Sequence, residues 1–479
     1  MKDKVAILGA GASGLGTYLG LIKNGYTNID VYNSSNRNNI RYSKLNNIEN
    51  LDKKIKNLYS ILKSLKNYGI LNRKSYLGAY LDEIKINKKS LIYNNNIEYG
   101  LTNFWGGILQ DFDDEYLSNN KVLNKSNTLK DKYRELSLTI PITNPGLNNK
   151  FINSISNNNA IKISNLNSKF NDYLNQKNEI NHFISPVSLE TSENKNFKEC
   201  LCIIGACPIH SIFSTEEYFK SQKIKVINQE IERINFKTNE IIFLDEKKKY
   251  DKIYINLGPY NSQKLIIKSM GLEENENILI KDGTSYVFPI YFTGKINFEN
   301  TKNFFNLTNN IINFKNQNDK TLTLQIYPST DHIIRSILPK FLFNMSSSIS
   351  NLFLKRILWV KCYLPYGVET EKTFSLTGKD FFEKKDINKI EQNKKFIFEK
   401  ISQVLKKSDF FPINITMNGK TSSHYSGCNQ NILKMFDASS SKISNNIILS
   451  DSTLWNSIPS QSPTFTIMAN AMDISTKNE

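Results

Sequence analysis

Apolar and polar positions at the start of the chain alternate in a pattern of strand, helix and strand. Val5 to Leu8 predicts a short buried strand, and the apolar spacing from Leu15 to Lys23 predicts a helix soon after it. Ile29 to Tyr32 predicts a second strand, which follows Gly25. Two strands joined by a helix within this length are typical of a βαβ unit and a parallel sheet.

The later part of the chain predicts mostly strands. Residues 224–236 and 239–245 predict alternating strands of a hairpin, residues 250–259 predict an apolar strand that ends at Gly258, and Ser262 to Met270 predicts a helix. Four further strand-like runs lie at residues 285–293, 321–328, 357–364 and 372–378. Strands placed between two halves of a nucleotide-binding unit indicate an antiparallel sheet inserted into the first domain.

Three stretches have weaker patterns. In the Lys- and Asn-rich region 36–100 only Ile55 to Lys66 predicts a helix, and in region 118–196 Tyr133 to Pro141 is the clearest ordered piece. Phe341 to Tyr366 mixes large apolar residues with Lys and Arg. We interpret this stretch as a core helix followed by a strand; the alternative is a helix that contacts a membrane surface.

The turn between the first strand and the first helix has the glycine spacing of a dinucleotide-binding loop. In the sequence GAGASG, Gly9 would form the tight turn, Gly11 would leave room for a pyrophosphate, and Gly14 would let the helix pack closely on the sheet. The exposed amides and the helix dipole would then bind an anion. A plain turn with no ligand is the alternative. Asn33 replaces the acid expected at the end of the second strand, but an amide can still bond a ribose hydroxyl.

Composition narrows the choice of partners. The chain has 479 residues, enough for two domains, and a net charge of +17. Lys and Asn are spread along the whole chain. A drift in amino-acid composition would therefore produce the net positive charge as readily as a basic binding face would. No nucleic-acid module and no apolar run of about 18 residues is present, so we expect neither a nucleic-acid partner nor a membrane span. No cleavable signal precedes the first strand, and we expect a cytoplasmic protein.

Cysteine spacing does not support a metal site. The five cysteines are too few for a disulfide framework in so long a chain. Cys200, Cys202 and Cys207 lie close together in the sequence, but their spacing fits neither a zinc site nor an iron–sulfur cluster well. We interpret them as small buried residues around a turn, with a metal site as the alternative.

The last part of the chain resembles a known family. The segments SSHYSGCN (422–429) and IILSDSTLWNSIPSQSPTFTIMANAMDIS (447–475) resemble the C-terminal signature of the glucose-methanol-choline (GMC) oxidoreductases, flavoproteins that oxidise alcohol groups. LTNFWGG (101–107) is similar to the loop that sits against the flavin in that family. CLCIIGACP (200–208) is similar to a stretch in a bacterial branch of the family that is often associated with cell-surface polysaccharide genes.

The resemblance implies roles for individual residues. His424 would be the base near flavin N5, because hydride leaves a carbinol carbon readily only as the hydroxyl proton is removed. A surface or capping histidine is the alternative. Ser462 falls where the family has a second His or Asn that helps hold the substrate hydroxyl, and a hydroxyl can do so without being a base. The residues that we assign to FAD binding are Gly9, Gly11, Ser13, Gly14, Asn33, Trp105, Gly106, Gly107, Ile231, Gly258, Asp451, Ser452, Pro463 and Thr464.

The resemblance and the patterns together predict a mixed α/β fold, with a Rossmann-like FAD-binding domain and an inserted substrate domain built on an antiparallel sheet. The FAD-binding domain would comprise residues 1–117, 197–280 and 415–479, and the substrate domain residues 118–196 and 281–414. The predicted function is transfer of hydride from a CH–OH group, on a sugar or sugar-derived alcohol, to FAD. A flavin-dependent sugar isomerase or mutase and an FAD-binding scaffold without activity are the alternatives. The electron acceptor and the oligomeric state are open.

Overall fold

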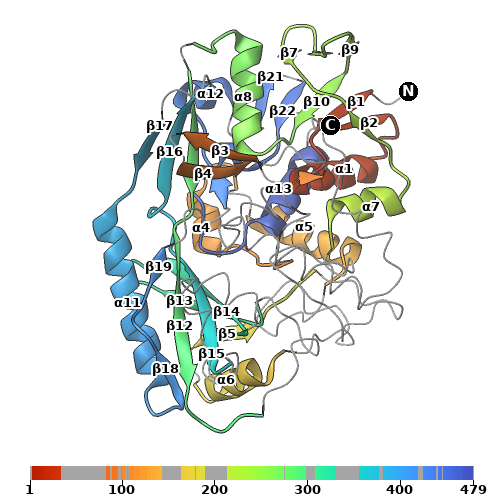
Figure 1. Ribbon diagram of the computed structural model, residues 1–479. Helices are drawn as coiled ribbons and strands as arrows, with labels where there is room; N and C mark the ends of the chain where they lie inside the picture. Colours follow the sequence, from red (N-terminus) through yellow and green to blue (C-terminus); the bar gives the residue numbers. More distant parts are fainter. Residues whose placement is uncertain are drawn as a thin grey trace, which may run out of the picture.

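Two large sheets, one in each half of the molecule, form the framework of the chain. The computed structural model describes residues 3–33, 82–86, 89–94, 99–100, 102, 105, 107–123, 126–142, 163–177, 180–188, 213–274, 276–297, 308–329, 355–376, 381–418, 424–437, 441–444 and 446–477. In Figure 1 a mainly parallel sheet lies in the upper half and an antiparallel sheet lies in the lower half.

The upper sheet, which we call the parallel sheet, is an open sheet of six strands. Its strand order is β21-β22-β10-β1-β2-β6, and only the edge pair β21 and β22 is antiparallel. The strands are β1 (Val5–Leu8), β2 (Ile29–Asn33), β6 (Val226–Asn228), β10 (Lys252–Ile255), β21 (Lys442–Ser444) and β22 (Ile447–Leu449). Strand β10 returns beside β1, as the sequence predicts, and β1 is fully buried.

The predicted hairpin of residues 224–236 and 239–245 is confirmed only in part: residues 233–235 pair antiparallel with residues 240–242, but residues 226–228 belong to another sheet. Gln229 and Glu230 interrupt the apolar pattern, and the chain leaves the parallel sheet there after β6, which pairs with β2. The next strand, β7 (Arg233–Asn235), belongs instead to a small three-stranded sheet with β8 (Glu240–Ile242) and β9 (Lys247–Lys249). The run thus contains strands of two different sheets, which alternation alone does not separate.

Helices α1 (Ala12–Lys23) and α13 (Thr464–Lys477) pack against each other in the upper half, although they come from opposite ends of the chain. A Cβ atom on Gly16 would overlap the carbonyl oxygen of Met468, and one on Gly20 would overlap the hydroxyl of Ser475. Contacts therefore advance in the same direction along both helices. The two helices are parallel, and their N-termini lie side by side.

Further helices and strands complete the upper half. The helices are α4 (Asp114–Asn119), α5 (Ser126–Thr139), α7 (Thr215–Ser221), α8 (Pro259–Met270), α12 (Gln430–Met435) and the 3₁₀ turn η5 (Ser452–Leu454). A four-stranded sheet has the order β17-β16-β11-β20, with β17 (Phe381–Lys384), β16 (Thr370–Ser375), β11 (Asn277–Asp282) and β20 (Tyr425–Ser426). The hairpin of β3 (Asp82–Ile86) and β4 (Lys89–Asn94) stands apart from these sheets.

The lower half contains the predicted antiparallel sheet, which we call the seven-stranded sheet. Its order is β18-β12-β15-β14-β13-β5, with β19 also paired to β12. The strands are β5 (Asn181–Ile184), β12 (Ser285–Phe292), β13 (Asn310–Lys315), β14 (Thr321–Tyr327), β15 (Ile357–Tyr363), β18 (Phe410–Pro412) and β19 (Met417–Asn418). Helices α6 (Asn165–Asn175) and α11 (Ile387–Leu405) share a hydrophobic core with one face of it.

Several sequence predictions lie outside the described residues: the helix from Ile55 to Lys66, Gly106, and Cys200, Cys202 and Cys207. The domain boundaries stay a prediction. Helix α5, which falls in the stretch 118–196 assigned to the substrate domain, buries Leu129, Tyr133 and Leu136 in the same core as β1.

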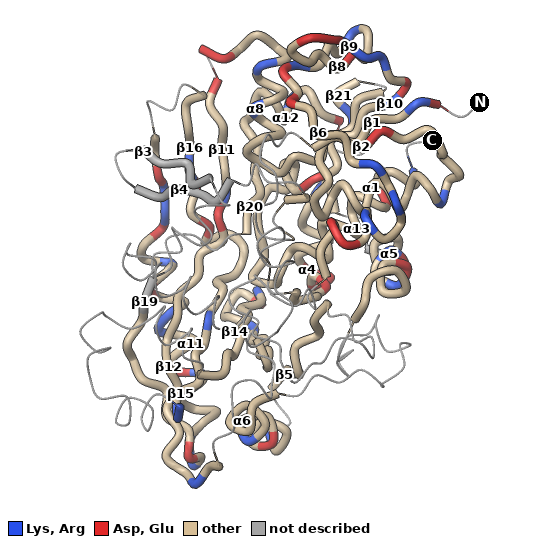
Figure 2. The backbone as a smooth tube through the Cα atoms, turned by 45° about the vertical axis from the view of Figure 1, so that its right-hand side comes forward, with Lys and Arg blue, Asp and Glu red and all other residues tan. Residues whose placement is uncertain are grey.

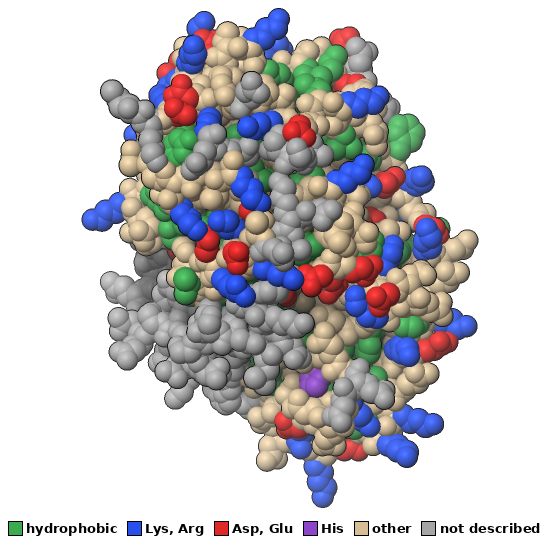
Figure 3. All heavy atoms as spheres, turned by 180° about the vertical axis from the view of Figure 1, so that it is seen from behind, with side chains coloured by type: hydrophobic (Ala, Val, Ile, Leu, Met, Phe, Trp, Pro, Cys, Tyr) green, Lys and Arg blue, Asp and Glu red, His purple; other side chains and the backbone are tan. Residues whose placement is uncertain are grey.

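Charge is mixed over the described surface. Basic and acidic residues are interspersed along the tube in Figure 2, and the face seen in Figure 3 has Lys and Arg side chains beside Asp and Glu. In the part of the chain that the structure describes, no helix is both long and apolar enough to cross a membrane.

The α1–α13 contact gives a test of the fold. Gly16→Ala should lower the free energy of unfolding by about 1–3 kcal/mol, because the new methyl group would overlap a backbone oxygen of α13. Alanine at a helix position otherwise stabilises by about 0.5–1 kcal/mol relative to glycine, so the sign of the change is informative. Urea unfolding measures it. The control is Ile22→Ala, on an exposed position of the same helix, which should change stability much less. A stabilised Gly16→Ala protein would contradict the close contact.

Candidate functional site

The glycine turn after β1 has the geometry that the sequence predicts. Gly9 has a φ of +112°, and a side chain on it would overlap the carbonyl of Asn256 at the end of β10. A Cβ atom on Gly14 would overlap the carbonyl oxygen of Gly9, so α1 lies directly against the turn. These two glycines are required by the packing of the chain itself.

Gly11 differs from the other two glycines of the turn. A Cβ atom there would meet only the Cα atom of Gly100 and the carbonyl oxygen of Tyr99, each at 3.8 Å, which is ordinary contact. Gly11 is the N-cap of α1 and provides no side-chain cap, so the first amides of the helix have no side-chain acceptor from the cap. The packing of the chain does not require a glycine at position 11. A ligand held close to the backbone there would require one.

Asn33 lies at the carboxyl end of β2 and is only 7% exposed. Its carbonyl oxygen accepts a hydrogen bond from the amide of Gln229, but its side-chain Nδ2 has no partner among the described residues. A buried donor without an acceptor costs about 1–3 kcal/mol. A ribose hydroxyl bound at this end of the sheet would accept that hydrogen bond, so the amide fits the role that the sequence assigns to it.

Ser13 uses its side chain within the fold. Its hydroxyl donates to the carbonyl oxygen of Asn256 at 3.4 Å, in a buried polar cluster that includes Thr17 and Ser450. The Nδ2 atom of Asn256 is buried and also has no partner among the described residues. Ser13 can therefore contribute to an anion site through its backbone amide in the first turn of α1.

Asp451 holds the ends of two elements together. One carboxylate oxygen accepts hydrogen bonds from the amide of Gly258 at 2.8 Å and from the hydroxyl of Ser262 at 2.6 Å. The other oxygen accepts from the amide and the hydroxyl of Thr453. Burial raises the pKa of Asp451, and these hydrogen bonds oppose that rise. The carboxylate thus fixes the start of α8 against η5, and it acts on any ligand only through the backbone that it positions.

The remaining cofactor candidates lie around the same edge of the parallel sheet. Ser452 donates its hydroxyl to the carbonyl oxygen of Tyr425, and Ile231 is half-buried against the core. Trp105 also packs on this core, and its indole N–H donates to the carbonyl oxygen of Phe213 at 2.7 Å. Gly107 has a φ of +70°, and its carbonyl oxygen accepts from the amide of Ser188. Gly258, Pro463 and Thr464 stand at the starts of α8 and α13.

Two helix N-termini meet at this edge. Because α1 and α13 are parallel and in contact, Gly11 and Thr464 mark neighbouring helix ends. Each N-terminus carries the equivalent of about half a positive charge. Two such ends side by side repel each other, and a bound anion relieves that repulsion.

The seven-stranded sheet has one apolar face and one polar face. Side chains on β14 alternate: Leu322, Leu324 and Ile326 belong to the core shared with α6 and α11, whereas Thr323 and Gln325 are on the other face. The register pairs Thr323 with Tyr363 and Gln325 with Lys361 of β15, and directly opposed residues share a face. This polar face is nevertheless largely buried, because the upper half of the molecule covers it.

His424 lies over this polar face. Its ring stacks flat on Tyr363, with centroids 4.6 Å apart and an angle of 8° between the planes. Its carbonyl oxygen accepts a hydrogen bond from the amide of Gly283, next to the buried ion pair of Asp282 and Lys372. Burial, together with the positive charge of Lys361, lowers the pKa of His424 to about 3. The imidazole is therefore neutral at neutral pH and able to accept a proton.

Ser462 contacts the same face one strand away. Gln325 of β14 donates its Nε2 hydrogen to the hydroxyl of Ser462 at 3.2 Å, and the amide of Ser462 donates to Oε1 of Gln110. The hydroxyl of Ser460, two residues earlier, is 3.0 Å from that of Thr323. The structure thus brings the two predicted catalytic residues to adjacent strands of one sheet, and the turn that holds Ser462 leads directly into α13.

Four residues of this arrangement were missed in the sequence: Gln110, Gln325, Lys361 and Tyr363. A signal for three of them was present. In TLTLQIY (321–327) and ILWVKCY (357–363) every second residue is large or polar. Both strands are nevertheless long and central in their sheet, where strands buried on both faces are usually apolar throughout. Polar residues at alternate positions of a central strand indicate a face that lines a site. No local pattern distinguishes Gln110.

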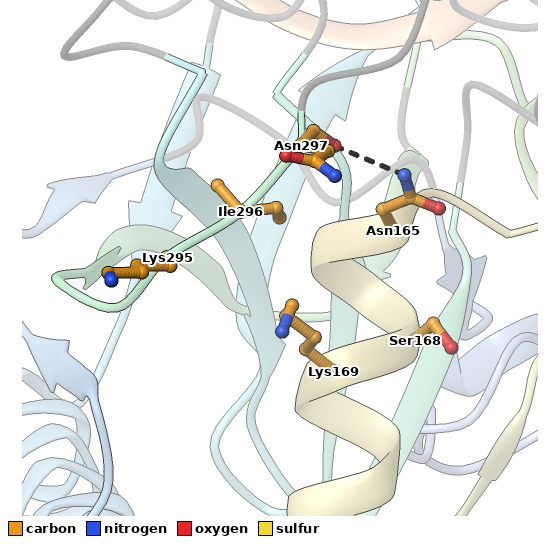
Figure 4. Close-up of a pocket in the computed structure, with 6 residues that line it drawn as sticks. All are labelled: Asn165, Ser168, Lys169, Lys295, Ile296 and Asn297. Carbon is orange, nitrogen blue, oxygen red and sulfur yellow. Dashed lines mark hydrogen bonds between the residues drawn. The ribbon is translucent and has the colours of Figure 1, made fainter.

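A separate open pocket of about 370 Å³ lies beside α6 (Figure 4). It is lined by Asn165, Ser168, Lys169, Lys295, Ile296 and Asn297, and the side-chain Nδ2 of Asn165 donates to the backbone carbonyl oxygen of Asn297. None of the predicted site residues is among them, and in Figure 1 α6 lies at the end of the molecule far from β1. Within the described ranges, no three His, Cys, Asp or Glu residues are grouped so that they could hold a metal ion.

Comparison with known proteins identifies the fold. No protein-family model matches the sequence, and no curated protein sequence is significantly similar to it. Among solved structures, the crystal structure of pyridoxine 4-oxidase from Mesorbium loti superimposes with a TM-score of 0.61 at 7% sequence identity. The match covers 99% of this chain and 98% of that chain. The described part of the chain therefore has this fold, which confirms the predicted fold class.

The Asp451 network gives a test of the site's framework. Asp451→Asn should lower the free energy of unfolding by at least about 2 kcal/mol, because an amide NH₂ would face donors where the carboxylate accepted hydrogen bonds. Thermal unfolding followed by circular dichroism measures the loss. The matched control is Asp251→Asn: Asp251 is exposed and accepts one backbone hydrogen bond from Lys4. Equal effects of the two substitutions would contradict the role of Asp451.

Proposed function

We propose that the chain is an FAD-dependent oxidoreductase of the GMC family, which oxidises a CH–OH group with His424 as the base. The observation that carries the proposal is the position of a neutral imidazole over the polar face of the seven-stranded sheet, with Ser462, the predicted second hydroxyl-binding residue, in contact with Gln325 on the next strand. The fold shared with pyridoxine 4-oxidase supports this reaction class. A sugar or sugar-derived substrate, as in the branch of the family associated with cell-surface polysaccharides, is supported by the sequence resemblance alone.

The residues at the edge of the parallel sheet fit FAD. The space beside Gly11 and the N-terminus of α1 suit a pyrophosphate, and the unsatisfied amide of Asn33 suits a ribose hydroxyl. The N-terminus of α13, which begins at Thr464, would stabilise negative charge on the flavin pyrimidine. When bound, FAD supplies a two-electron acceptor that takes the hydride from the carbinol carbon.

The chain's own residues handle the proton. His424 is unprotonated at neutral pH and accepts the hydroxyl proton while the C–H bond breaks, so that the alcohol becomes a carbonyl compound. Tyr363 holds the imidazole plane by stacking, which fixes the direction in which its ring nitrogens point. Ser462, held by Gln325, offers a hydroxyl that can donate to or accept from the substrate oxygen.

His424→Ala tests the proton transfer. In the protein loaded with FAD, anaerobic bleaching of the flavin absorbance by a substrate alcohol should slow by about 10²–10⁴-fold, the usual contribution of general base catalysis. The control is His182→Ala, because His182 lies on β5 and is bound to Asn175 of α6, away from the predicted site. The proposal fails if the His424→Ala protein reduces its flavin as fast as the control does.

Gly11→Val tests the cofactor site. The purified variant should lose its FAD, because the side chain would occupy the space beside the helix N-terminus. Since a Cβ atom at position 11 makes only ordinary contact with the chain, cofactor-free Gly11→Ala should unfold at nearly the same urea concentration as the cofactor-free parent while binding FAD more weakly. A fully loaded yellow Gly11→Val protein would overturn the assignment.

A further inference from the structure

Lys361 is placed among the residues of the proposed catalytic site. It lies on β15, and its position in the register is opposite Gln325, which holds Ser462. The ring of Tyr363, two residues along the same strand, stacks on the ring of His424. Lys361 is therefore on the polar face of the seven-stranded sheet, between the contacts of the two predicted catalytic residues.

The ammonium group of Lys361 and the imidazole of His424 both contact the ring of Tyr363. The Nζ atom of Lys361 lies 4.6 Å from the centre of the Tyr363 ring, and the His424 ring is stacked on the same tyrosine at 4.6 Å. Its charge lowers the pKa of His424, so the two groups interact through space. This positive charge opposes the imidazolium that forms when the base takes a proton.

A substrate with a negative charge would offset the unfavourable effect of the Lys361 ammonium on the protonated form of His424. An anionic group near Lys361 would screen the ammonium from His424, which would raise the pKa of the base when the substrate binds. The same ammonium would attract and orient the anion. A neutral alcohol offers neither effect.

We propose that the alcohol oxidised at this site carries an anionic group, a carboxylate or a phosphate, that Lys361 binds on the polar face of the seven-stranded sheet. The inference rests on the proposed alcohol oxidation, because it names the substrate class of that reaction. It makes Lys361 a specificity-determining residue. The hydride and the hydroxyl proton still leave the same C–H and O–H bonds.

Matched alcohols test the inference. The FAD-loaded protein is mixed anaerobically with glycerol, glycerate and glycerol 3-phosphate, and with glucose, gluconate and glucose 6-phosphate, and reduction of the flavin is followed by absorbance. At least one anionic compound should reduce the flavin with a kcat/KM more than tenfold above that of its neutral parent. Raising the salt concentration should shrink that advantage. Whether the carboxylates or the phosphates react faster identifies the group.

Variants of Lys361 separate charge from structure. Lys361→Met should remove the advantage of the anionic alcohol over its neutral parent, mainly by raising KM for the anionic compound. Lys361→Arg should keep most of the advantage, because it keeps the charge. The matched control is Lys395→Met on α11, an exposed lysine of the helix that covers the opposite face of the sheet; it should change nothing.

A binding measurement makes the test independent of turnover. Calorimetric titration with glycerol 3-phosphate and with glycerate should detect binding to the parent protein that Lys361→Met weakens at least tenfold. NMR titration of His424 should show a pKa that rises on anion binding and also rises in Lys361→Met, because each change offsets or removes the same positive charge.

The two proposals fail in different ways. Reduction by neutral alcohols at equal or greater kcat/KM overturns the anionic substrate but leaves alcohol oxidation standing. Anion binding without reduction of the flavin by any alcohol supports the role of Lys361 and overturns the reaction. Equal losses for neutral and anionic alcohols in Lys361→Met, or no binding of either anion, overturn the role of Lys361.

Discussion

The parallel contact between α1 and α13 is the constraint on which the rest of the structure depends. It joins the two ends of the chain, and it is possible only because Gly16 and Gly20 have no side chains where the α13 backbone approaches. Because the helices run in the same direction, the glycine turn before α1 and the Ser462 turn before α13 are neighbours. One helix begins beside the parallel sheet and the other begins beside the seven-stranded sheet, so this single contact fixes the two halves of the proposed site relative to each other.

The sequence predicted those parts of the fold that local patterns determine. Val5 to Leu8 is apolar at every position because β1 is covered on both faces, and such a run followed by GAGASG is recognisable without the structure. The division of residues 224–236 between two sheets was not predictable, because pairing partners are set by distant segments: β6 pairs with β2 and β7 with β8. The role of Gly16 and Gly20 was missed for the same reason, since the surface that they fit is over 440 residues away in the chain.

The site shows the same division between local and distant information. His424 and Ser462 were found because they stand in segments that resemble a family signature. Tyr363, Gln325 and Lys361 come from two strands that are antiparallel neighbours, and only the register brings them together under those residues. Asp451 shows that a correct residue can have an indirect role. Its carboxylate is satisfied by Gly258, Ser262 and Thr453, so the chain uses it to build the edge of the site rather than to contact a ligand.

Both halves of the proposed site contain positively charged groups. Two helix N-termini bring partial positive charge to one edge of the parallel sheet, and Lys361 lies on the polar face of the seven-stranded sheet, while the buried Asp451 carboxylate accepts hydrogen bonds within the fold. Burial and the positive charge of Lys361 lower the pKa of His424 to about 3, so the imidazole is unprotonated at neutral pH but is also a weak base. An anionic group on the substrate would raise the pKa of His424 when the substrate binds, and would make the imidazole a stronger base for the proton transfer. The low pKa of His424 in the free protein is therefore compatible with general base catalysis, provided that the negative charge comes from what binds there.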